Sequence, residues 1–311
     1  MNLLKILKNK FLNVCNHPHL ILVHLLDAFS WMITSDELFL KWMFRLRQGY
    51  PLNLVSPKTY SEKIQWLKLY NRKPEYTTLV DKVKVKDWVA GKIGSEYIIP
   101  TLGVYKKAED IDFNELPDQF VLKCNHNSGE GMFICKDKSS MDETAVRNNL
   151  NKGLAENLYM KYREWPYKNV ERRIIAEKYM KDSITPTLND YKIMCFDGKV
   201  KLIELHQGRF TEKHTQDFYD RDWNKTSIAQ GSYGETSKEV VDRPALLDKM
   251  IELSEILATD IPHVRVDWYI VDGKLYFGEM TLFDGAGLDP WDRYEDDLLM
   301  GSWLTLPEKT I

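Results

Sequence analysis

The sequence predicts an α+β protein that begins with a helical region. Residues 1 to about 80 carry apolar side chains mostly at helical spacing, and from residue 118 the pattern changes to short apolar strands. Several of these strands are joined by short glycine-containing turns, which are typical of antiparallel hairpins. With 311 residues, the chain has room for one large domain or two ordinary ones.

The composition argues against several classes of protein. Apolar residues make up 43% of the chain and charged residues 29%, the balance of a soluble globular protein. The net charge is -3, whereas a dedicated nucleic-acid-binding protein usually carries a basic surplus. The cysteines lie far apart without a C-x-x-C pair, so we expect neither a disulfide scaffold nor a zinc site, and a reducing cytoplasm fits. They are Cys15, Cys124, Cys135 and Cys195.

The first 33 residues have two interpretations. Residues 1–13 alternate leucines with Lys5, Lys8 and Lys10, which indicates a short amphipathic helix. Residues 19–33 are apolar but contain two histidines and an aspartate, and they fall short of the roughly 20 apolar residues of a membrane span. We favour a buried helix here. The alternative is a peripheral membrane anchor whose lysines face lipid head groups.

The next elements are helices. Residues 60–70 place Ile64 and Leu67 on one broad apolar stripe, and Thr59 or Ser61 is positioned to cap the start. A second helix is expected near 80–92, followed by an extended piece at 97–100. Further along the chain we expect helices within 141–162 and 243–259.

The strands follow from apolar runs bounded by turn residues. Two Asp-Gly turns, at 197–198 and 272–273, each join two such runs into a hairpin. The predicted strands are 119–125, 132–135, 173–180, 190–196, 199–205, 263–270 and 274–282.

The last hairpin is the most informative segment. Apolar residues alternate there with Arg265 and Asp267, and Glu279 lies on the partner strand. Unpaired buried charges are costly, and two converging carboxylates suit a Mg²⁺ ion bound to phosphates. The alternative is an exposed strand face that carries ordinary charges.

The register decides whether these carboxylates share a face. A two-residue turn in a regular ladder sends Glu279 to the face opposite Asp267. We predict instead a three-residue loop with Gly273 in the left-handed conformation, which pairs Arg265 with Glu279. Five side chains then share one face: Arg265, Asp267, Phe277, Glu279 and Thr281.

Three other segments are candidates for ligand contacts. Lys123 ends a strand before the loop 128–131, where a lysine and backbone N–H groups can meet phosphate oxygens. The segment 177–180 leaves a strand in the way that a connector lining an adenine pocket does. Each has an ordinary alternative, a surface turn and a plain strand end. A third, cationic cluster can steady an anionic substrate or a transferring phosphoryl group, or it is a solvated loop. It consists of His206, Arg209, Lys213 and His214.

Taken in order, these motifs resemble the ATP-grasp superfamily. The likeness is greatest to the branch named for the teichuronopeptide biosynthesis protein TupA, which is found with bacterial surface-polysaccharide genes, and it covers roughly residues 37–291. Further segments that carry the resemblance are 57–70, Asp81-Lys82, 99–105 and 218–223.

The resemblance implies an ATP-grasp fold, in which two α+β subdomains clasp ATP. It divides the chain into a helical N-terminal region (1–80), a first subdomain with the phosphate lid and adenine hinge (81–180), and a second with the metal and substrate site (181–311). By position, the nucleotide contacts are Lys82, Lys123, the lid residues Ser128, Gly129 and Gly131, the adenine-site residues Glu177, Lys178 and Met180, and Asp190 toward the ribose.

The resemblance also implies the remaining roles and Mg²⁺ as a cofactor. Asp267 and Glu279 correspond to metal ligands, and Arg265 and Lys123 to catalytic cations. Many ATP-grasp enzymes have Asn two residues after the ligand Glu, whereas this chain has Thr281, a weaker ligand. His206, Arg209 and Lys213 are then expected to bind substrate.

The implied activity is an ADP-forming ligase that joins a carboxylate to an amine through an acyl-phosphate. Family context favours two substrates, an amino acid and a uronic acid of a capsular or surface polysaccharide or of its lipid-linked or free precursor. Family context also places the enzyme in the cytoplasm. A further expectation is that it contacts the inner face of the membrane through residues 1–33. The alternatives are a sugar kinase and a nucleotide-sugar glycosyltransferase, for which Asp220-Arg-Asp222 is the candidate metal motif.

Overall fold

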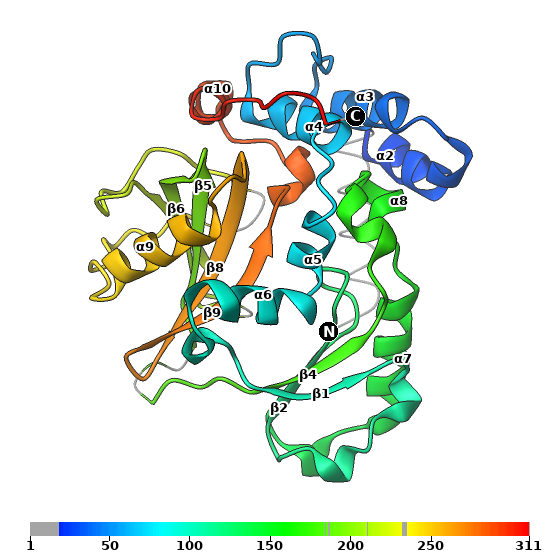
Figure 1. Ribbon diagram of the computed structural model, residues 1–311, viewed down its shortest axis with the longest axis vertical. Helices are drawn as coiled ribbons and strands as arrows, with labels where there is room; N and C mark the ends of the chain where they lie inside the picture. The colour runs from blue at the N-terminus through cyan, green and yellow to red at the C-terminus, as the bar shows by residue number, and fades with distance from the viewer. Residues whose placement is uncertain (1–18, 184, 186, 210, 232–234, 311) are drawn as a thin grey trace.

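The computed structural model describes residues 19–183, 185, 187–209, 211–231 and 235–310. Two antiparallel sheets organise this part of the chain, one of four strands and one of five. They lie in different parts of the molecule, with α5 and α6 between them and the N-terminal helices gathered at one end (Figure 1). The predicted helix at residues 1–13 lies outside the described residues.

The bounds of the elements are as follows. The α-helices are α2 (His19–Ala28), α3 (Asp36–Gln48), α4 (Tyr60–Tyr70), α5 (Tyr76–Val80), α6 (Lys84–Ile93), α7 (Glu143–Ala155), α8 (Leu158–Tyr162), α9 (Leu247–Leu257) and α10 (Tyr294–Ser302). The strands are β1 (Thr101–Tyr105), β2 (Phe120–Cys124), β3 (Met132–Cys135), β4 (Ile174–Lys178), β5 (Asp190–Phe196), β6 (Lys199–Gln207), β7 (Thr215–Tyr219), β8 (His263–Val271) and β9 (Lys274–Thr281).

The four-stranded sheet has the order β1-β4-β2-β3. Its strands alternate between two faces, so Phe120, Leu122 and Cys124 of β2 enter one apolar core together with Val146 and Leu150 of α7. The intervening residues of β2 point to the opposite face. Lys123 lies on that second face, beside Ile175 of the neighbouring strand β4.

The five-stranded sheet has the order β7-β6-β5-β8-β9. One face is apolar, and α9 covers it: Val264, Val266 and Trp268 of β8 share a core with Met250 and Leu253 (Figure 1). The other face is polar in its centre, because Asp267 pairs with Lys192 and Lys192 pairs with Glu204 across three adjacent strands. A row of paired charges on a buried sheet face marks this surface as the site.

The helical region closes over the same sheet. Thr59 caps α4 with a capping box to Glu62, as the sequence predicts. The start of α4 is tied to the C-terminal helix because the backbone and side chain of Ser61 both donate to Asp297, at 2.8 and 3.1 Å. Tyr60 and Ile64 belong to the core of the five-stranded sheet. Helix α4 is therefore part of the structure that supports the site.

The predicted register of the last hairpin is wrong, although its main consequence holds. The turn at Asp272-Gly273 has two residues, both with positive φ, and Val271 pairs with Lys274. A bulge in β9 opposite Asp267 and Trp268 then shifts the ladder by one residue, so Asp267 pairs with Glu279 and Arg265 with Thr281. These four side chains share a face as expected.

Phe277 does not share that face, which corrects the prediction for this residue. It pairs with Trp268 and packs in the apolar core. The extra residue of the bulge is Gly278, where a Cβ atom would come within 3.2 Å of the carbonyl oxygen of Asp267. The one-residue shift that brings Glu279 to the face of Asp267 was expected in the turn. It occurs instead inside the strand, at Gly278.

Other expectations need smaller corrections. The helical stretch at 141–162 is two helices, α7 and α8, because Asn157 caps a new start. Strands β1 and β7 were not predicted as such. The favoured burial of residues 19–33 is also wrong, because Leu22, Phe29 and Trp31 are 53%, 52% and 68% exposed.

Candidate active site

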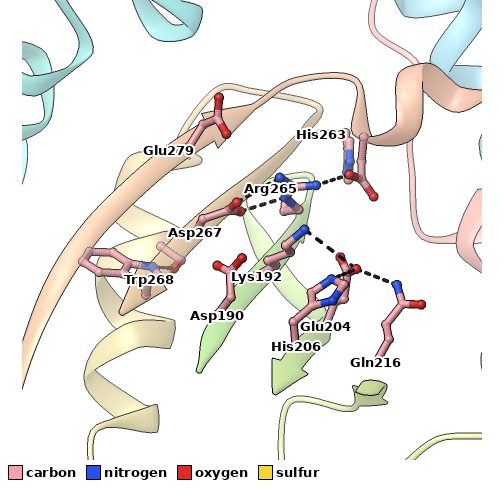
Figure 2. A network of polar contacts seen from close by, with 12 residues as sticks. Asp190, Lys192, Glu204, His206, Gln216, His263, Arg265, Asp267, Trp268 and Glu279 are labelled. Atoms are coloured by element: carbon pink, nitrogen blue, oxygen red, sulfur yellow. Dashed lines mark hydrogen bonds and ion pairs between the residues drawn. The ribbon is translucent and has the colours of Figure 1, made fainter. Parts of the chain in front are cut away.

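Arg265 and Asp267 form the centre of the polar face. The guanidinium donates from Nε and Nη2 to the two carboxylate oxygens of Asp267, at 2.7 and 2.9 Å, and also contacts Asp284 (Figure 2). Burial raises the pKa of Asp267 to about 6 although Arg265 opposes the shift. One arginine shared by two carboxylates leaves this spot short of positive charge, so a cation is stabilised there.

Glu279 connects the two sheets. Its Oε1 lies 2.6 Å from Nζ of Lys82, which also donates to the carbonyl of Asn127 at the end of the first sheet. The backbone N–H of Lys82 donates to the carbonyl of Asn125. Burial opposes ionisation of Glu279, but Lys82 outweighs it and lowers the pKa to about 2. Glu279 is thus a carboxylate held next to the hairpin of β2 and β3.

Glu177 lies between two lysines on the first sheet. Lys86 of α6 and Lys123 of β2 approach its two oxygens at 2.5 and 2.6 Å. Burial would raise the pKa of Glu177, yet the two cations hold it below its ordinary value. Two lysines around one carboxylate leave this face with an excess positive charge, the reverse of the Arg265 centre.

The loop between β2 and β3 has an anchored end and an open tip. Gly131 has φ +72°, and a Cβ atom there would lie 2.6 Å from Sγ of Cys124 and 2.8 Å from Cα of Gly153. Gly129 has φ +97° with nothing within 4 Å of its Cβ position, and Ser128 is exposed. The loop therefore presents a free backbone turn from a fixed hinge.

A buried hydrogen-bond network continues the polar face across β5, β6 and the start of β7. Oε1 of Glu204 accepts from Nε2 of Gln216 at 2.7 Å and lies 2.6 Å from Nε2 of His206 (Figure 2). Lys192 approaches the same carboxylate at 3.9 Å. Nδ1 of His206 is 2.7 Å from Nε2 of His214.

The other predicted site residues surround this face. Asp190 is buried and accepts from Arg209 at 2.6 Å, while its second oxygen has no hydrogen-bond partner among the described residues. Lys213 is exposed, as is Lys178 at the end of β4, and Met180 is half-buried. His206 is nearly fully buried. The structure thus gives His206 and Arg209 acidic partners instead of leaving them as a free cationic cluster.

Several residues of the site escaped the sequence analysis. They are Lys86, Asp284, Lys192 and Glu204. His214 was named, but its hydrogen bond with His206 was not foreseen. Lys192 and Glu204 had a usable signal, since each interrupts an apolar strand two residues from another polar residue. Lys86 and Asp284 come from separate elements, and the sequence gives no spacing that connects them to Glu177 or Arg265.

The residues present fit one hard divalent cation shared with phosphate oxygens. Asp267 and Glu279 are paired on one face and supply carboxylate oxygens, and Thr281 is the next residue on that face. Within the described ranges, no group of three or more His, Cys, Asp or Glu side chains is placed to hold a metal alone. Phosphate oxygens would have to complete the coordination, as is usual for Mg²⁺.

Two other places in the molecule lack such a combination of groups. Asp220 of the Asp-x-Asp motif accepts from the backbone N–H groups of Asp222 and Asn224, which is a turn and leaves no converging carboxylate pair. A cavity of about 660 Å³ lies instead between α3, α4 and the C-terminal segment, lined by Trp66, Tyr70 and Lys309 among others. None of the candidate catalytic residues lines it.

The fold and the site together define an ATP-grasp protein, with a lysine-bearing glycine-loop hairpin on one sheet and a charged hairpin on the other. The chain belongs to the TupA-like ATP-grasp family, whose model matches residues 62–305. Among curated proteins, none matches the sequence significantly.

Solved structures of ATP-grasp ligases are similar at low identity. The D-alanine–D-alanine ligase of Bacillus anthracis, complexed with ATP, is 19% identical with a TM-score of 0.41, over 72% of this chain and 63% of that one. The corresponding ligase of Helicobacter pylori is 12% identical with a TM-score of 0.43, over 79% and 69%. The chain thus spans somewhat less than two thirds of the first of these enzymes.

Proposed function

We propose that this protein is an ATP-dependent carboxylate–amine ligase that forms ADP through an acyl-phosphate. The observation that carries the proposal is the contact between Lys82 and Glu279, 2.6 Å long, which joins the two sheets at their charged faces. It brings a surplus of lysine charge, suited to phosphates, next to a pair of carboxylates suited to Mg²⁺. We propose that the two sheets lie in the two clasping subdomains, 81–180 and 181–311.

The first sheet supplies the nucleotide contacts in this proposal. Lys82 and Lys123 hold phosphate oxygens, and backbone N–H groups of the loop from Ser128 through Gly129 to Gly131 close over them. Glu177 keeps both neighbouring lysines in position, because it binds Lys86 and Lys123 at once. Glu177, Lys178 and Met180 line the adenine site, and Asp190 reaches the ribose.

The second sheet supplies the metal ligands and the catalytic cation. Asp267 and Glu279 would hold Mg²⁺ together with the phosphates, with Thr281 as a weak or water-mediated ligand. When bound, the ion neutralises charge on the transferring phosphoryl group. Arg265 donates to the acyl-phosphate and to the oxyanion that forms when the amine attacks. Phosphorylation turns a carboxylate, a poor electrophile, into an acyl group with a good leaving group.

The substrates that we propose are the carboxylate of a uronic acid and the amine of an amino acid. The uronic acid belongs to a surface or capsular polysaccharide or to its lipid-linked precursor, and the reaction takes place in the cytoplasm. Family membership supports this choice. Arg209 and the exposed Lys213 bind the anionic substrate, and His206 acts from within the buried network described above.

A product assay tests the proposal. The protein is incubated with ATP, Mg²⁺, glucuronic-acid and galacturonic-acid oligosaccharides and an amino-acid mixture, and ADP and product masses are measured. ADP release that requires both substrates, with loss of one water from their summed mass, supports the ligase. ADP release without an amine and a product heavier by one phosphate would identify a sugar kinase. Release of a nucleoside diphosphate from a sugar donor would identify a glycosyltransferase.

We also propose that the helical end contacts a membrane. Exposed apolar side chains gather on α2, α3 and the turn between them: Leu22, Leu25, Phe29, Trp31, Met32 and Trp42. The preceding sequence contributes Lys5, Lys8 and Lys10. No helix in the described ranges is long and apolar enough to span a bilayer. Aromatic side chains and the apolar faces of amphipathic helices bind at the interface between lipid head groups and acyl chains.

Vesicle binding tests this contact. We expect the full chain to sediment with vesicles that contain anionic phospholipid, and the double variant Phe29→Ser, Trp31→Ser to lose most of that binding. Val55→Ser removes an even more exposed apolar side chain outside the patch, 99% exposed, and serves as the control. Equal binding by both variants would contradict the proposed contact.

A further inference from the structure

The network on β6 continues through His206 to His214, in the segment that leads into β7. His206 lies 2.6 Å from the carboxylate of Glu204 through Nε2 and 2.7 Å from Nε2 of His214 through Nδ1. Nδ1 of His214 makes no hydrogen bond with any residue that the structure describes, and His214 is half-buried. The three side chains therefore form a chain from a buried acid to an accessible nitrogen.

The proton positions follow from the acid end. Lys192 and Gln216 also approach Glu204. Burial opposes ionisation of Glu204, but Lys192 and His206 outweigh it and keep its pKa below the ordinary value. As a carboxylate, Glu204 can only accept, so His206 must donate from Nε2. When His206 is neutral, its Nδ1 accepts from Nε2–H of His214. Neutral His214 then carries a lone pair on Nδ1.

The network is close enough to the metal carboxylates to serve the same reaction. Adjacent strands are about 4.8 Å apart, so β6 lies roughly 10 Å from β8. Lys192, on the intervening strand β5, pairs with both Asp267 and Glu204.

We propose that His214 is the base that removes the proton from the attacking amine, and that His206 and Glu204 position it. The inference rests on the proposed ligase activity and adds to it a residue for the second half-reaction. The amine nitrogen forms a C–N bond with the acyl carbon, and its proton moves to Nδ1 of His214. The C–O bond to phosphate breaks, and its electron pair leaves with the phosphate.

The surroundings favour the neutral form of His214 before the reaction. Burial, His206, Arg209 and Lys192 lower its pKa, whereas Glu204 raises it. Asp190 and Arg209 form an ion pair at the edge of this group, and Arg265 faces Glu204 from β8. After transfer, the proton on Nε2 of His214 can shift to His206, where Glu204 stabilises the imidazolium ion.

Hydroxylamine separates this step from acyl-phosphate formation. It is largely unprotonated near neutral pH and traps acyl-phosphates as hydroxamates without the help of a base. We expect His214→Gln to form hydroxamate within about twofold of the wild type and to lose about 100-fold of amide formation. The acidic limb of the amide pH profile, which reports protonation of the base, should disappear in this variant. His24→Gln, on the exposed side of α2, is the matched control.

A second variant tests the positioning role. Glu204→Gln keeps the size of the side chain but removes the charge, so the imidazolium ion is less stable. We expect about a tenfold loss of amide formation and little change in hydroxamate formation. The acidic limb of the amide pH profile should move to lower pH, because Glu204 raises the pKa of His214. Equal loss of both products in the His214 variant, or no loss of either, would overturn the inference.

A measurement without substrates tests the proton positions separately from the ligase activity. In ¹⁵N spectra of the wild type near pH 8, we expect His214 as the neutral tautomer protonated on Nε2, and a proton on Nε2 of His206. A His214 protonated on Nδ1 would refute the assigned base. If the wild type makes no ATP-dependent hydroxamate with any carboxylate tested, the ligase proposal fails, and the base assignment fails with it.

Discussion

The two sheets carry opposite charge surpluses on the faces that meet at the site. On the four-stranded sheet, Glu177 is shared by Lys86 and Lys123, so cations exceed acids. On the last hairpin, Arg265 is shared by Asp267 and Asp284, so acids exceed cations. The two faces are therefore suited to different ligands, the first to phosphate oxygens and the second to a divalent cation.

The point where the two faces meet is a single ion pair. Lys82 comes from the segment before α6, and Glu279 comes from β9. Each carries the charge that is in excess on its own side, and the two neutralise each other. A nucleotide bound with a metal would offer both a new partner, because phosphate can replace Glu279 at Lys82 and the metal can replace Lys82 at Glu279.

The largest expected effect comes from the acidic face. Asp267→Asn keeps the shape of the side chain and removes the charge, so the proposed metal ligand is lost while Arg265 keeps its contact with Asp284. We expect ATP-dependent turnover to fall by about 10² to 10³-fold with the fold intact. Product assays and circular dichroism spectra measure the two properties.

A matched substitution lies in the turn of the same hairpin. Asp272→Asn changes an exposed aspartate with positive φ, a conformation that Asn also tolerates. We expect normal turnover in this variant. Full activity of the Asp267 variant would show that the acidic face does not bind the catalytic metal.

The sequence predicted the acidic face better than the cationic one. Arg265, Asp267 and Glu279 lie on one hairpin, where a period of two and a glycine decide which side chains converge. Even so, the sequence does not show where the extra residue of the hairpin lies. A bulge at Gly278 and a three-residue loop both place Glu279 on the same face as Asp267. Only coordinates separate them.

The cationic face depends on contacts between elements far apart in the chain. Lys86 lies on α6, and its partner Glu177 lies on β4, 91 positions further along the chain. Glu177 was predicted for the adenine site from its place at a strand end, and its two ion pairs could not be foreseen. Local periodicity fixes faces, whereas the packing of helix on sheet fixes which charges meet.

The second prediction concerns the loop of the cationic face. Gly131→Ala introduces a Cβ atom against Cys124 and Gly153 in a left-handed residue, so we expect a loss of about 3 kcal/mol or more in the free energy of unfolding. Gly129→Ala meets no neighbour and should cost about 1 kcal/mol. Urea unfolding compares the two. Similar losses would contradict the description of a fixed hinge with an open tip.

The third prediction tests the ion pair between the sheets. Because Lys82 lowers the pKa of Glu279 from 4.5 to about 2, the pair stabilises the fold above pH 4.5, and this stability is lost as the pH falls toward 2. We expect Lys82→Met to reduce the free energy of unfolding by about 2–3 kcal/mol at pH 7 in EDTA, and by much less near pH 2.5.

The control for this variant is an exposed pair of the same length. Lys41 and Glu37 are also 2.6 Å apart, but both side chains are nearly half exposed. Lys41→Met should therefore change stability little at either pH, because solvent screens such pairs. If both lysine variants behaved alike, the link between the sheets would not stabilise the protein.

The smallest expected effect separates the two lysines around Glu177. Lys86 also donates to the carbonyl of Ile99 and the hydroxyl of Thr101, which ties it to the fold. Lys123 projects from β2 beside the loop 128–131, which we propose closes over the phosphates. Lys123→Met should therefore raise the KM for ATP about tenfold, equivalent to about 1.4 kcal/mol of binding. Lys86→Met should mainly lower the melting temperature. Because each variant leaves Glu177 one lysine, a KM effect of equal size in both would mean that the surplus charge alone, and not the position of Lys123, binds the nucleotide.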